Sequence, residues 1–532
     1  MASFIDRLLG RSTDASEIAA VPEQRQTLAR GSSAIGRRPG VRTGVQRISA
    51  PRAEYDGATL GRRAAGWRRT RLDANAELSP AVQQALRGIA RDLERNNPWA
   101  QAGVSKIAEH MVGTGITFQV HRNGKIDNAL NALARKHFDK TRCDAEGLHD
   151  LYGMQLQAAR TIVVGGEVLL RRRWRRLSDR LPLPFQMQVL EADYLDSSKH
   201  GPMSSAPGKQ GAHLIHGIQF SPIGQREGYW LYNAHPGAAR PSEHGSTFVQ
   251  AKDVAHVFRA DRPEQQRGAT WFAPVILRIK DFGDFEDGQL TRQKIASAFA
   301  GFVKGDADAA FPGIGTEGED GEDGDAGEFY DREPLDYVES GTIQYLREGE
   351  DIVFPTPPTV DGYIDYSRVS LRAISAGLGV PYEMLTGDLS QVSFISGRLG
   401  RLTFNRALAT WQWLMFIPRF CAAVEQWFLD AAEMMGHNID GVELRWTPPK
   451  QEMLDPASEV PANRDAVRAG QKTHSQVVRE NGDDPDTFFA ELADDLKRLD
   501  DLGIVLDSDP RRVTQVGNAV QVPNADQREP KK

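Results

Sequence analysis

A long apolar segment in the C-terminal third constrains this chain more than any other feature. Between residues 394 and 435, large apolar side chains recur at helical spacing, which predicts one very long helix. The stripe consists of Leu399, Leu402, Leu408, Trp411, Leu414, Phe416, Ile417, Phe420, Val424, Trp427 and Phe428. Pro418 should kink this helix, because proline lacks an N–H and its ring clashes with the preceding turn. A helix this apolar should pack against other helices or a neighbouring subunit.

The composition is that of a folded protein. The chain has 532 residues, 40% of them hydrophobic and 26% charged, enough for two to four domains at roughly 100–200 residues each. Cys143 and Cys421 are the only cysteines, so neither a disulfide framework nor a Cys-rich zinc site is expected, and a reducing cytoplasm suits assembly. No window approaches the roughly 20 apolar residues of a membrane span, and the first residues lack the pattern of a secretory signal.

The net charge of −7 hides two segments of opposite charge. Residues 1–76 are rich in arginine, whereas residues 306–339 hold thirteen acidic residues against the single Arg332. Two surfaces with different partners are one explanation, and two solvated, mobile segments are the other. The acidic tract lacks the spacing of an EF-hand calcium loop, so we interpret it as a disordered loop. Residues 1–50 have no apolar periodicity and are expected to form a flexible arm.

Helices and strands can be assigned coarsely. Ser79 and Pro80 predict the start of one helix, and Asn97 with Pro98 the start of a second that stops at Gly113. Further helices are expected at about 128–140, 147–164, 271–304 and 363–378, and two or three polar ones before residue 502. Strands are expected at 116–122, 167–174 and 442–446, and alternating segments make residues 184–260 rich in β-structure.

No catalytic motif is found. The chain lacks a phosphate-binding G-x-x-x-x-G-K-[ST] loop, H-E-x-x-H, G-x-S-x-G and S-x-x-K, so we expect no enzyme, no cofactor and no metal. His213 and His216 lie three residues apart in a β region and would not form a helical metal site. The basic run RRRWRR at residues 171–176 could contact phosphates or pair with acids of a neighbouring subunit, and the sequence leaves both open.

The segment ISAGLGVPYEMLTGDLSQVSFISGRLGRL, residues 374–402, is similar to a stretch of the lambda-type portal proteins of tailed bacteriophages. There, a helix with this ending is followed by a Ser/Asn-rich loop and a long helix. The matching residues are Ile374, Gly377, Leu378, Gly379, Val380, Tyr382, Glu383, Leu385, Thr386, Gly387, Asp388, Ser390, Ser393, Ser396 and Arg398. Segments beginning NPWAQAGVSK, RGATWFAPVIL and VELRWTPPKQ also resemble the family, so the resemblance covers residues 50–505 in order.

The resemblance implies an α+β portal fold assembled as a ring, which the family forms from twelve copies at one capsid vertex. Double-stranded DNA is packaged and ejected through the ring, and a separate terminase motor hydrolyses the ATP. The implied parts are a flexible arm (1–50), wing (51–270), outgoing stem helix (271–304), clip (305–362), returning stem helix (363–380), tunnel loop (381–393), long kinked helix and wing strand (394–449), crown (450–505) and flexible tail (506–532).

The resemblance also implies which residues meet the partners. The tunnel loop would present Asp388, Leu389, Ser390, Gln391, Val392 and Ser393 to the DNA. The clip would dock the terminase large subunit and later a head-completion (adaptor) protein, with Glu317, Glu319, Asp320, Glu322, Asp323 and Asp325 as candidate contacts. Major capsid or scaffold protein would surround the ring, within the virion and away from any membrane. The alternatives are another head or neck protein without a channel, and a DNA-processing enzyme.

Overall fold

The computed structural model describes residues 70–203, 211–238, 245–298, 302–304, 351–353, 362–450, 452–453 and 455–504, together with Gly66 and Leu506. For residues 295–298, 302–304 and 351–353 it describes the backbone alone. The described residues from Arg71 onward belong to one compact unit. The predicted arm, the six candidate clip acids and residues 507–532 of the predicted tail lie outside the described residues.

The second and third helices begin at the residues that the sequence predicts, whereas the short first helix was not predicted. The order is α1 (Ala74–Glu77), α2 (Pro80–Asn96) and α3 (Pro98–Val112). The side chain of Asn97 accepts a hydrogen bond of 3.0 Å from the amide of Ala100, which caps α3. Gly113 ends α3 with a φ of 56°, a value that favours glycine. Helix α3 then packs against α5 (Leu151–Gly165). Helix α4 spans Asn128–Phe138, close to its prediction.

Two three-stranded sheets support these helices. The first has the order β13-β1-β2, with β1 at Thr117–Arg122, β2 at Lys125–Ile126 and β13 at Val442–Thr447. The second has the order β10-β3-β4, with β3 at Glu167–Trp174, β4 at Phe185–Glu191 and β10 at Val254–Phe258. All four pairings are antiparallel. The register of β1 on β13 joins segments more than 300 residues apart, with Thr117 opposite Thr447.

A five-stranded antiparallel sheet accounts for the β-rich middle of the chain. Its strands, in order, are β5 (Gly201–Pro202), β6 (His213–Ile215), β7 (Ile218–Phe220), β8 (Arg226–Tyr232) and β9 (Ser246–Gln250). One face of it buries Phe220, Tyr229 and Leu231 in a small core shared with Leu169 of β3. The large core of the protein lies elsewhere, among α3, α5, β1, β3 and the C-terminal helices.

The helix predicted at 271–304 is shorter in the structure. Helix α6 spans Ile276–Ala298, and Phe302–Lys304 form strand β11, which pairs with β12 (Asp351–Val353). Residues 271–275 form turns, because the hydroxyl of Thr270 accepts a hydrogen bond from the amide of Phe272 and Pro274 follows. Trp271 and Phe272 are buried in the core rather than carried on a helix. The prediction was therefore wrong at both ends.

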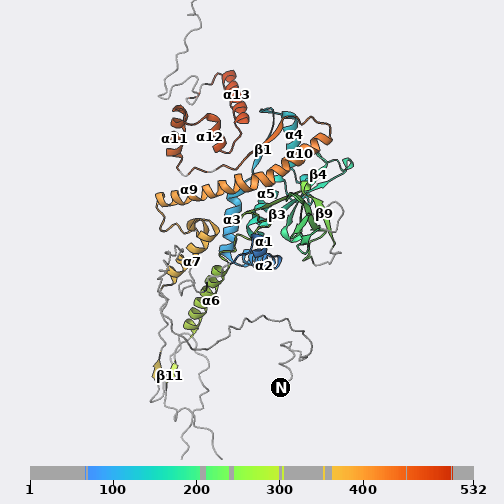
Figure 1. The fold of residues 1–532 in the computed structure, drawn as a ribbon. Helices are drawn as coiled ribbons and strands as arrows, with labels where there is room; N and C mark the ends of the chain where they lie inside the picture. Colours follow the sequence, from blue (N-terminus) through green and yellow to red (C-terminus); the bar gives the residue numbers. More distant parts are fainter. Residues whose placement is uncertain are drawn as a thin grey trace, which may run out of the picture. The chain divides into compact units, whose positions relative to one another are not determined.

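The long apolar helix exists, in three parts. Helix α7 (Tyr363–Leu378) and the short α8 (Tyr382–Thr386) lead to α9 (Phe394–Trp411), the π-helical segment η7 (Gln412–Cys421) and α10 (Ala422–Met434). Figure 1 shows these last three following one another as a single orange rod, with α3 meeting α9. The two halves differ in burial. Helix α10 buries Val424, Trp427, Phe428, Ala431 and Ala432, whereas α9 buries only Phe404 and Leu408 among its described residues.

Pro418 lies inside the π-helical segment. A wider turn leaves room for the proline ring, which would clash with a carbonyl four residues earlier in an α-helix. The sequence therefore located the irregularity correctly but did not predict its form, and a kink at Pro418 stays a prediction. Beyond β13 come the polar helices α11 (Pro456–Arg468), α12 (His474–Glu480) and α13 (Pro485–Leu502).

Candidate DNA-channel loop

The segment leading into the candidate loop is anchored in the core. Helix α7 ends at Gly379, whose φ of 75° lets the chain turn, and the amide of Val380 bonds back to the carbonyl of Ser375 at 3.1 Å. Val380 and Leu385 are both buried. Gly387 then ends α8 with a φ of 71°. These contacts fix the point from which the loop leaves the core.

Asp388 organises the loop itself. Its carboxylate accepts hydrogen bonds from the amide and hydroxyl of Ser390, and from the hydroxyl of Tyr382 at 3.2 Å. These bonds, those from Ser390 first, lower the pKa of Asp388 below its usual value, so the group is charged near neutral pH. A carboxylate that bonds its own backbone two residues on is a common way to hold a tight turn.

The far end of the loop is the start of α9. The hydroxyl of Ser393 accepts a bond from the amide of Ser396 at 3.2 Å, and the hydroxyl of Ser396 accepts one from the amide of Ser393 at 3.0 Å. This reciprocal cap satisfies two donors that a helix start leaves open. Hydrogen bonds therefore define both ends of the loop, and most residues between them are exposed.

The structure brings the six candidate tunnel-loop residues together on one exposed turn between α8 and α9. Leu389, Ser390, Gln391 and Ser393 are exposed, and Asp388 and Val392 are partly buried. Leu389 is 68% exposed although it is a large apolar residue. Phe394 and Ile395, at the start of α9, are exposed as well. Phe394 and Ile395 therefore give the start of α9 an exposed apolar surface next to the loop.

Three arginines of the basic run at 171–176 bind side chains of the same chain. Arg172 is buried and pairs with Asp253 at 2.7 Å and Asp430 at 2.6 Å, while its guanidinium lies 4.5 Å from the ring centre of Trp174. Arg173 and Arg175 donate to the side chains of Gln188 and Gln186. Arg172 therefore takes neither of the roles that the sequence left open, because its partners belong to its own chain.

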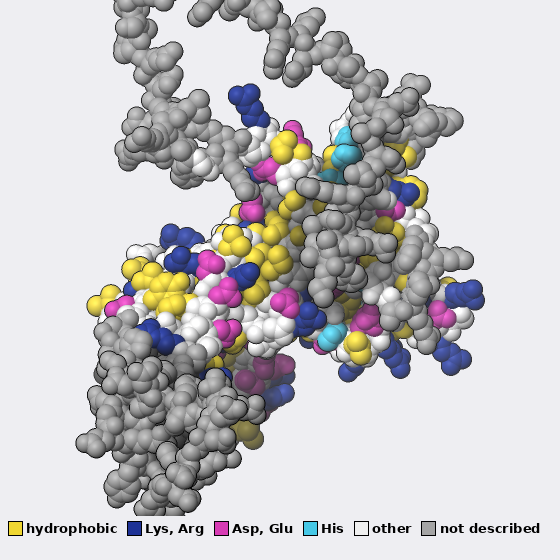
Figure 2. Space-filling model, turned by 90° about the horizontal axis from the view of Figure 1, so that it is seen from below, with side chains coloured by type: hydrophobic (Ala, Val, Ile, Leu, Met, Phe, Trp, Pro, Cys, Tyr) yellow, Lys and Arg dark blue, Asp and Glu magenta, His cyan; other side chains and the backbone are white. Residues whose placement is uncertain are grey.

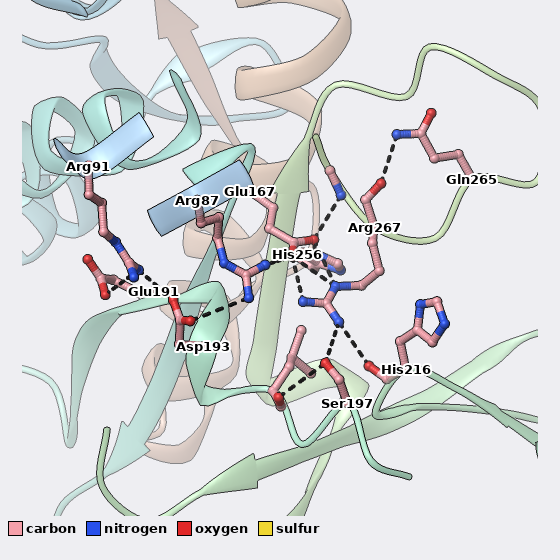
Figure 3. Close-up of polar contacts among 12 residues, drawn as sticks. Arg87, Arg91, Glu167, Glu191, Asp193, Ser197, His216, His256, Gln265 and Arg267 are labelled. Carbon is pink, nitrogen blue, oxygen red and sulfur yellow. Dashed lines mark hydrogen bonds and ion pairs between the residues drawn. The ribbon is translucent and has the colours of Figure 1, made fainter. Parts of the chain in front are cut away.

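A buried charge cluster was not predicted from the sequence. Glu167, at the start of β3, accepts hydrogen bonds from Arg267 at 2.8 Å, from His256 at 2.9 Å and from the amide of Gly268 at 2.9 Å. Figure 3 shows Arg87 reaching the same carboxylate from α2, and Arg91 joining Glu191 and Asp193. Arg267 also donates to Ser197 and to the carbonyl of His216. The cluster joins α2, β3, β10 and the β6–β7 turn.

The electrostatics of this cluster indicate a structural role. Burial alone would raise the pKa of Glu167, but Arg267 and His256 bring it well below its usual value. Burial also lowers the pKa of His256 to about 4, so its imidazole is neutral near pH 7 and Nε2–H donates to the carboxylate. Its charged side chains pair with one another inside the protein, so the cluster ties together the elements that carry them.

The histidines noted in the sequence are not brought into a metal site. His213 stacks on Phe220 with ring centres 5.2 Å apart, and His216 sits in the β6–β7 turn with a φ of 47°. Neither belongs to either of the groups of three potential metal ligands in the part of the chain that the structure describes. Within that same part, no helix combines the length and apolarity that crossing a membrane requires.

Comparison with known proteins finds relatives over most of the chain. The family model described as "Phage portal protein, lambda family" matches residues 60–412. The probable portal protein of Halomonas phage phiHAP-1 is 23% identical over 443 residues, which cover 79% of this chain and 82% of that protein. Portal protein B of Escherichia phage lambda is 22% identical over 492 residues, covering 82% of this chain and 87% of that protein.

Solved structures show a weaker likeness. The neck of an empty gene transfer agent particle, computed with C6 symmetry, matches with a TM-score of 0.45 and 16% identity over 77% of this chain and 98% of that chain. The neck of the native particle, computed with C12 symmetry, gives 0.44 and 15% over 76% and 95%.

The family model and the relatives by sequence define one class, the phage portal proteins. The chain belongs to the lambda family of that class, since the family model matches well over half of it. The resemblance of residues 374–402 predicted this family, and the prediction is confirmed. The names of the matched family and relatives describe a portal protein and none describes an enzyme.

Proposed function

We propose that twelve copies of this chain form a ring at one vertex of a viral capsid, and that double-stranded DNA enters and leaves the virion through its centre. The exposed, braced loop between α8 and α9 is the observation that carries the proposal. Family membership supports it, because the loop follows the motif on which the family resemblance rests. In the ring, residues 388–393 would face the channel.

The chemistry of the loop suits contact with moving DNA. Residues 388–393 contain neither lysine nor arginine, and their one charge is that of Asp388. Each cation that binds a phosphate displaces a counterion and adds affinity that must be broken when the DNA advances. An exposed surface of Leu389, Ser390 and Gln391 touches DNA without holding it. The brace from Asp388 keeps that surface extended into the channel.

Unpartnered apolar side chains support assembly into a ring. Ile395 is 79% exposed and Leu399 66%, and helices α6 and α7 expose further apolar residues. They include Leu277 and Leu290 of α6 and Ile364 and Val369 of α7. Figure 2 shows hydrophobic side chains gathered into patches on the face that it presents. Patches of this kind are rare on monomeric proteins, and a neighbouring copy would cover them.

The remaining partners follow from the proposed position of the ring. The clip, including Glu317, Glu319, Asp320, Glu322, Asp323 and Asp325, would dock the terminase large subunit and later an adaptor protein. Major capsid or scaffold protein would contact the ring periphery, where the Arg-rich arm would also lie. Assembly would take place in the host cytoplasm before the virion is complete.

Deletion of residues 389–393 tests the role of the loop. Rings counted by negative-stain microscopy should persist, because α9 keeps its apolar surface, while packaging of DNA into heads should fall. Ile223→Ser is a control for the loss of an exposed apolar side chain away from the loop, since Ile223 is 87% exposed in the β7–β8 turn. Wild-type packaging by the deletion variant would show that the loop does not line the channel. A monomer at micromolar concentration in every buffer would reject the ring.

A further inference from the structure

We propose that His121, Asp484 and Asp486 bind a divalent transition-metal ion, which fastens the start of α13 to strand β1. The ligand atoms offered by these three residues lie within 4.8 Å of one another. The site joins residues more than 360 positions apart in the chain. It is independent of the proposed channel, because none of its residues lies in the loop at 388–393.

His121 provides the strongest indication of a ligand. Its side chain is completely buried, and Nδ1 has no hydrogen-bond partner among the described residues. The other ring nitrogen, Nε2, lies 3.1 Å from the side-chain oxygen of Gln119. A neutral imidazole that donates through Nε2–H keeps a lone pair on Nδ1. A buried lone pair without a partner costs stability, and a metal ion would remove that cost.

The orientation of His121 is fixed by a second layer of contacts. The amide nitrogen of Gln119 donates to the hydroxyl of Thr487 in the first turn of α13, so the amide oxygen of Gln119 is directed at His121. Metal-binding histidines commonly donate their second N–H to an oxygen in this way, which sets the tautomer. The hydroxyl that anchors this chain of bonds lies one residue from Asp486.

Both carboxylates retain atoms for a metal. Asp484 caps α13 by accepting a bond of 2.9 Å from the amide of Thr487 through Oδ2, which leaves Oδ1. Asp486 is exposed. Among the residues that the structure describes, no lysine or arginine lies within 4 Å of either carboxylate. Two neighbouring carboxylates without a cation repel each other, and a divalent ion would neutralise both.

The donor set indicates the type of ion. One imidazole nitrogen with two carboxylate oxygens suits zinc and similar first-row ions, whereas magnesium and calcium prefer oxygen alone. Bonds of about 2.0–2.2 Å separate two ligands of a zinc ion by roughly 3–4 Å. The ligands therefore need to close only slightly from their present spacing. A fourth position would be taken by water, on the exposed side of Asp486.

The other group of three potential ligands shows what argues against a metal. Glu191, Asp193 and His235 also lie within reach of one ion. However, Arg91 already bonds both carboxylates, and His235 Nε2 lies 3.2 Å from Glu191. A guanidinium occupies the position that a metal would take and neutralises its ligands. The His121 site lacks such a cation among the described residues.

Zinc binding to the untagged full-length protein, first stripped with a chelator, tests the proposal. Isothermal titration should give one high-affinity zinc per chain, which a tenfold excess of magnesium does not displace. Asp486→Asn should weaken zinc binding at least tenfold, since the amide keeps the shape and loses the charge. Asp483→Asn is the matched control, because Asp483 is an exposed acid three residues earlier and outside the group.

A second measurement reports on His121 without altering the fold. Zinc should slow amide hydrogen exchange in both β1 and the first turn of α13, and Asp486→Asn should abolish that change. Cobalt bound in place of zinc should give the visible absorption of a tetrahedral site. Absence of zinc binding, or equal affinity in wild type and Asp486→Asn, would overturn the proposal. Protection confined to α13 would overturn the link to β1.

Discussion

Nε of Arg267 lies 2.8 Å from the carboxylate of Glu167, and neither side chain is more than 1% exposed. Removing one partner of a buried ion pair leaves an uncompensated charge in the core. We expect Glu167→Gln to lower the free energy of unfolding by about 3–5 kcal/mol. Denaturant unfolding measures the change. Glu191→Gln is the control, because that carboxylate is half exposed and its pair with Arg91 should contribute no more than about 1 kcal/mol.

Arg172 and Arg176 belong to the same basic run and should behave differently. Arg172→Met leaves Asp253 and Asp430 without their shared partner, and because both carboxylates are partly exposed the cost should be about 1–3 kcal/mol. Arg176 is exposed, and Arg176→Met should stay within about 0.5 kcal/mol of wild type. Thermal unfolding of the two variants side by side checks this. Equal stability would mean that Arg172 is not held by the two aspartates.

Buried His137 should make stability depend on pH. It packs between Phe138 and Phe185, and burial lowers its pKa to about 4. Below about pH 6.5 the imidazole of His137 is protonated in the unfolded chain, whereas in the folded protein it stays neutral until about pH 4. The unfolding free energy should therefore fall over that window, by roughly 3 kcal/mol in all. His137→Phe should remove this part of the slope, measured as the difference between variant and wild type at pH 7.5 and 5.

Two helical glycines give a matched test of packing. A Cβ on Gly377 of α7 would lie 2.2 Å from Cγ1 of Val275, whereas a Cβ on Gly400 of α9 would meet nothing within 4 Å. Gly377→Ala should therefore destabilise the protein by about 1–3 kcal/mol through overpacking. Gly400→Ala should be neutral or stabilising by up to about 1 kcal/mol. The denaturant midpoints of the two variants, each compared with wild type, measure these changes. A Gly377→Ala variant as stable as wild type would show that Val275 moves aside.

The sequence predicted elements whose boundaries depend on local chemistry. Pro80, Asn97 and Gly113 start or stop helices through their own backbone geometry, and the strand at 167–174 was predicted at its observed bounds. The loop at 388–393 came from the family resemblance, as part of a loop expected at 381–393. In the structure Tyr382–Thr386 form α8, so the exposed turn is shorter than expected. The predicted start of the helix at 271–304 was wrong because Trp271 and Phe272 fit a helical pattern but are buried in a turn before α6.

What could not be predicted depends on residues far apart in the chain. Glu167 meets His256 and Arg267, which follow it by 89 and 100 positions. Hydrophobic periodicity does not predict contacts between residues so far apart. The one available signal was a glutamate at the start of the apolar strand EVLL, which indicates a buried partner for its charge. His121 gave no signal at all, because Asp484 and Asp486 look like ordinary residues of a helix start.

The pairing of β1 with β13 also bears on how the protein is made. Thr117 cannot meet Thr447 until the ribosome has added some 330 further residues. At roughly 5–20 residues per second, that interval lasts tens of seconds. Until then the edge of β1 that pairs with β13 is uncovered. Phe118 and Val120 still lack the residues opposite them, Trp446 and Leu444. Nascent chains of this protein should therefore rely on a chaperone until translation has passed residue 447.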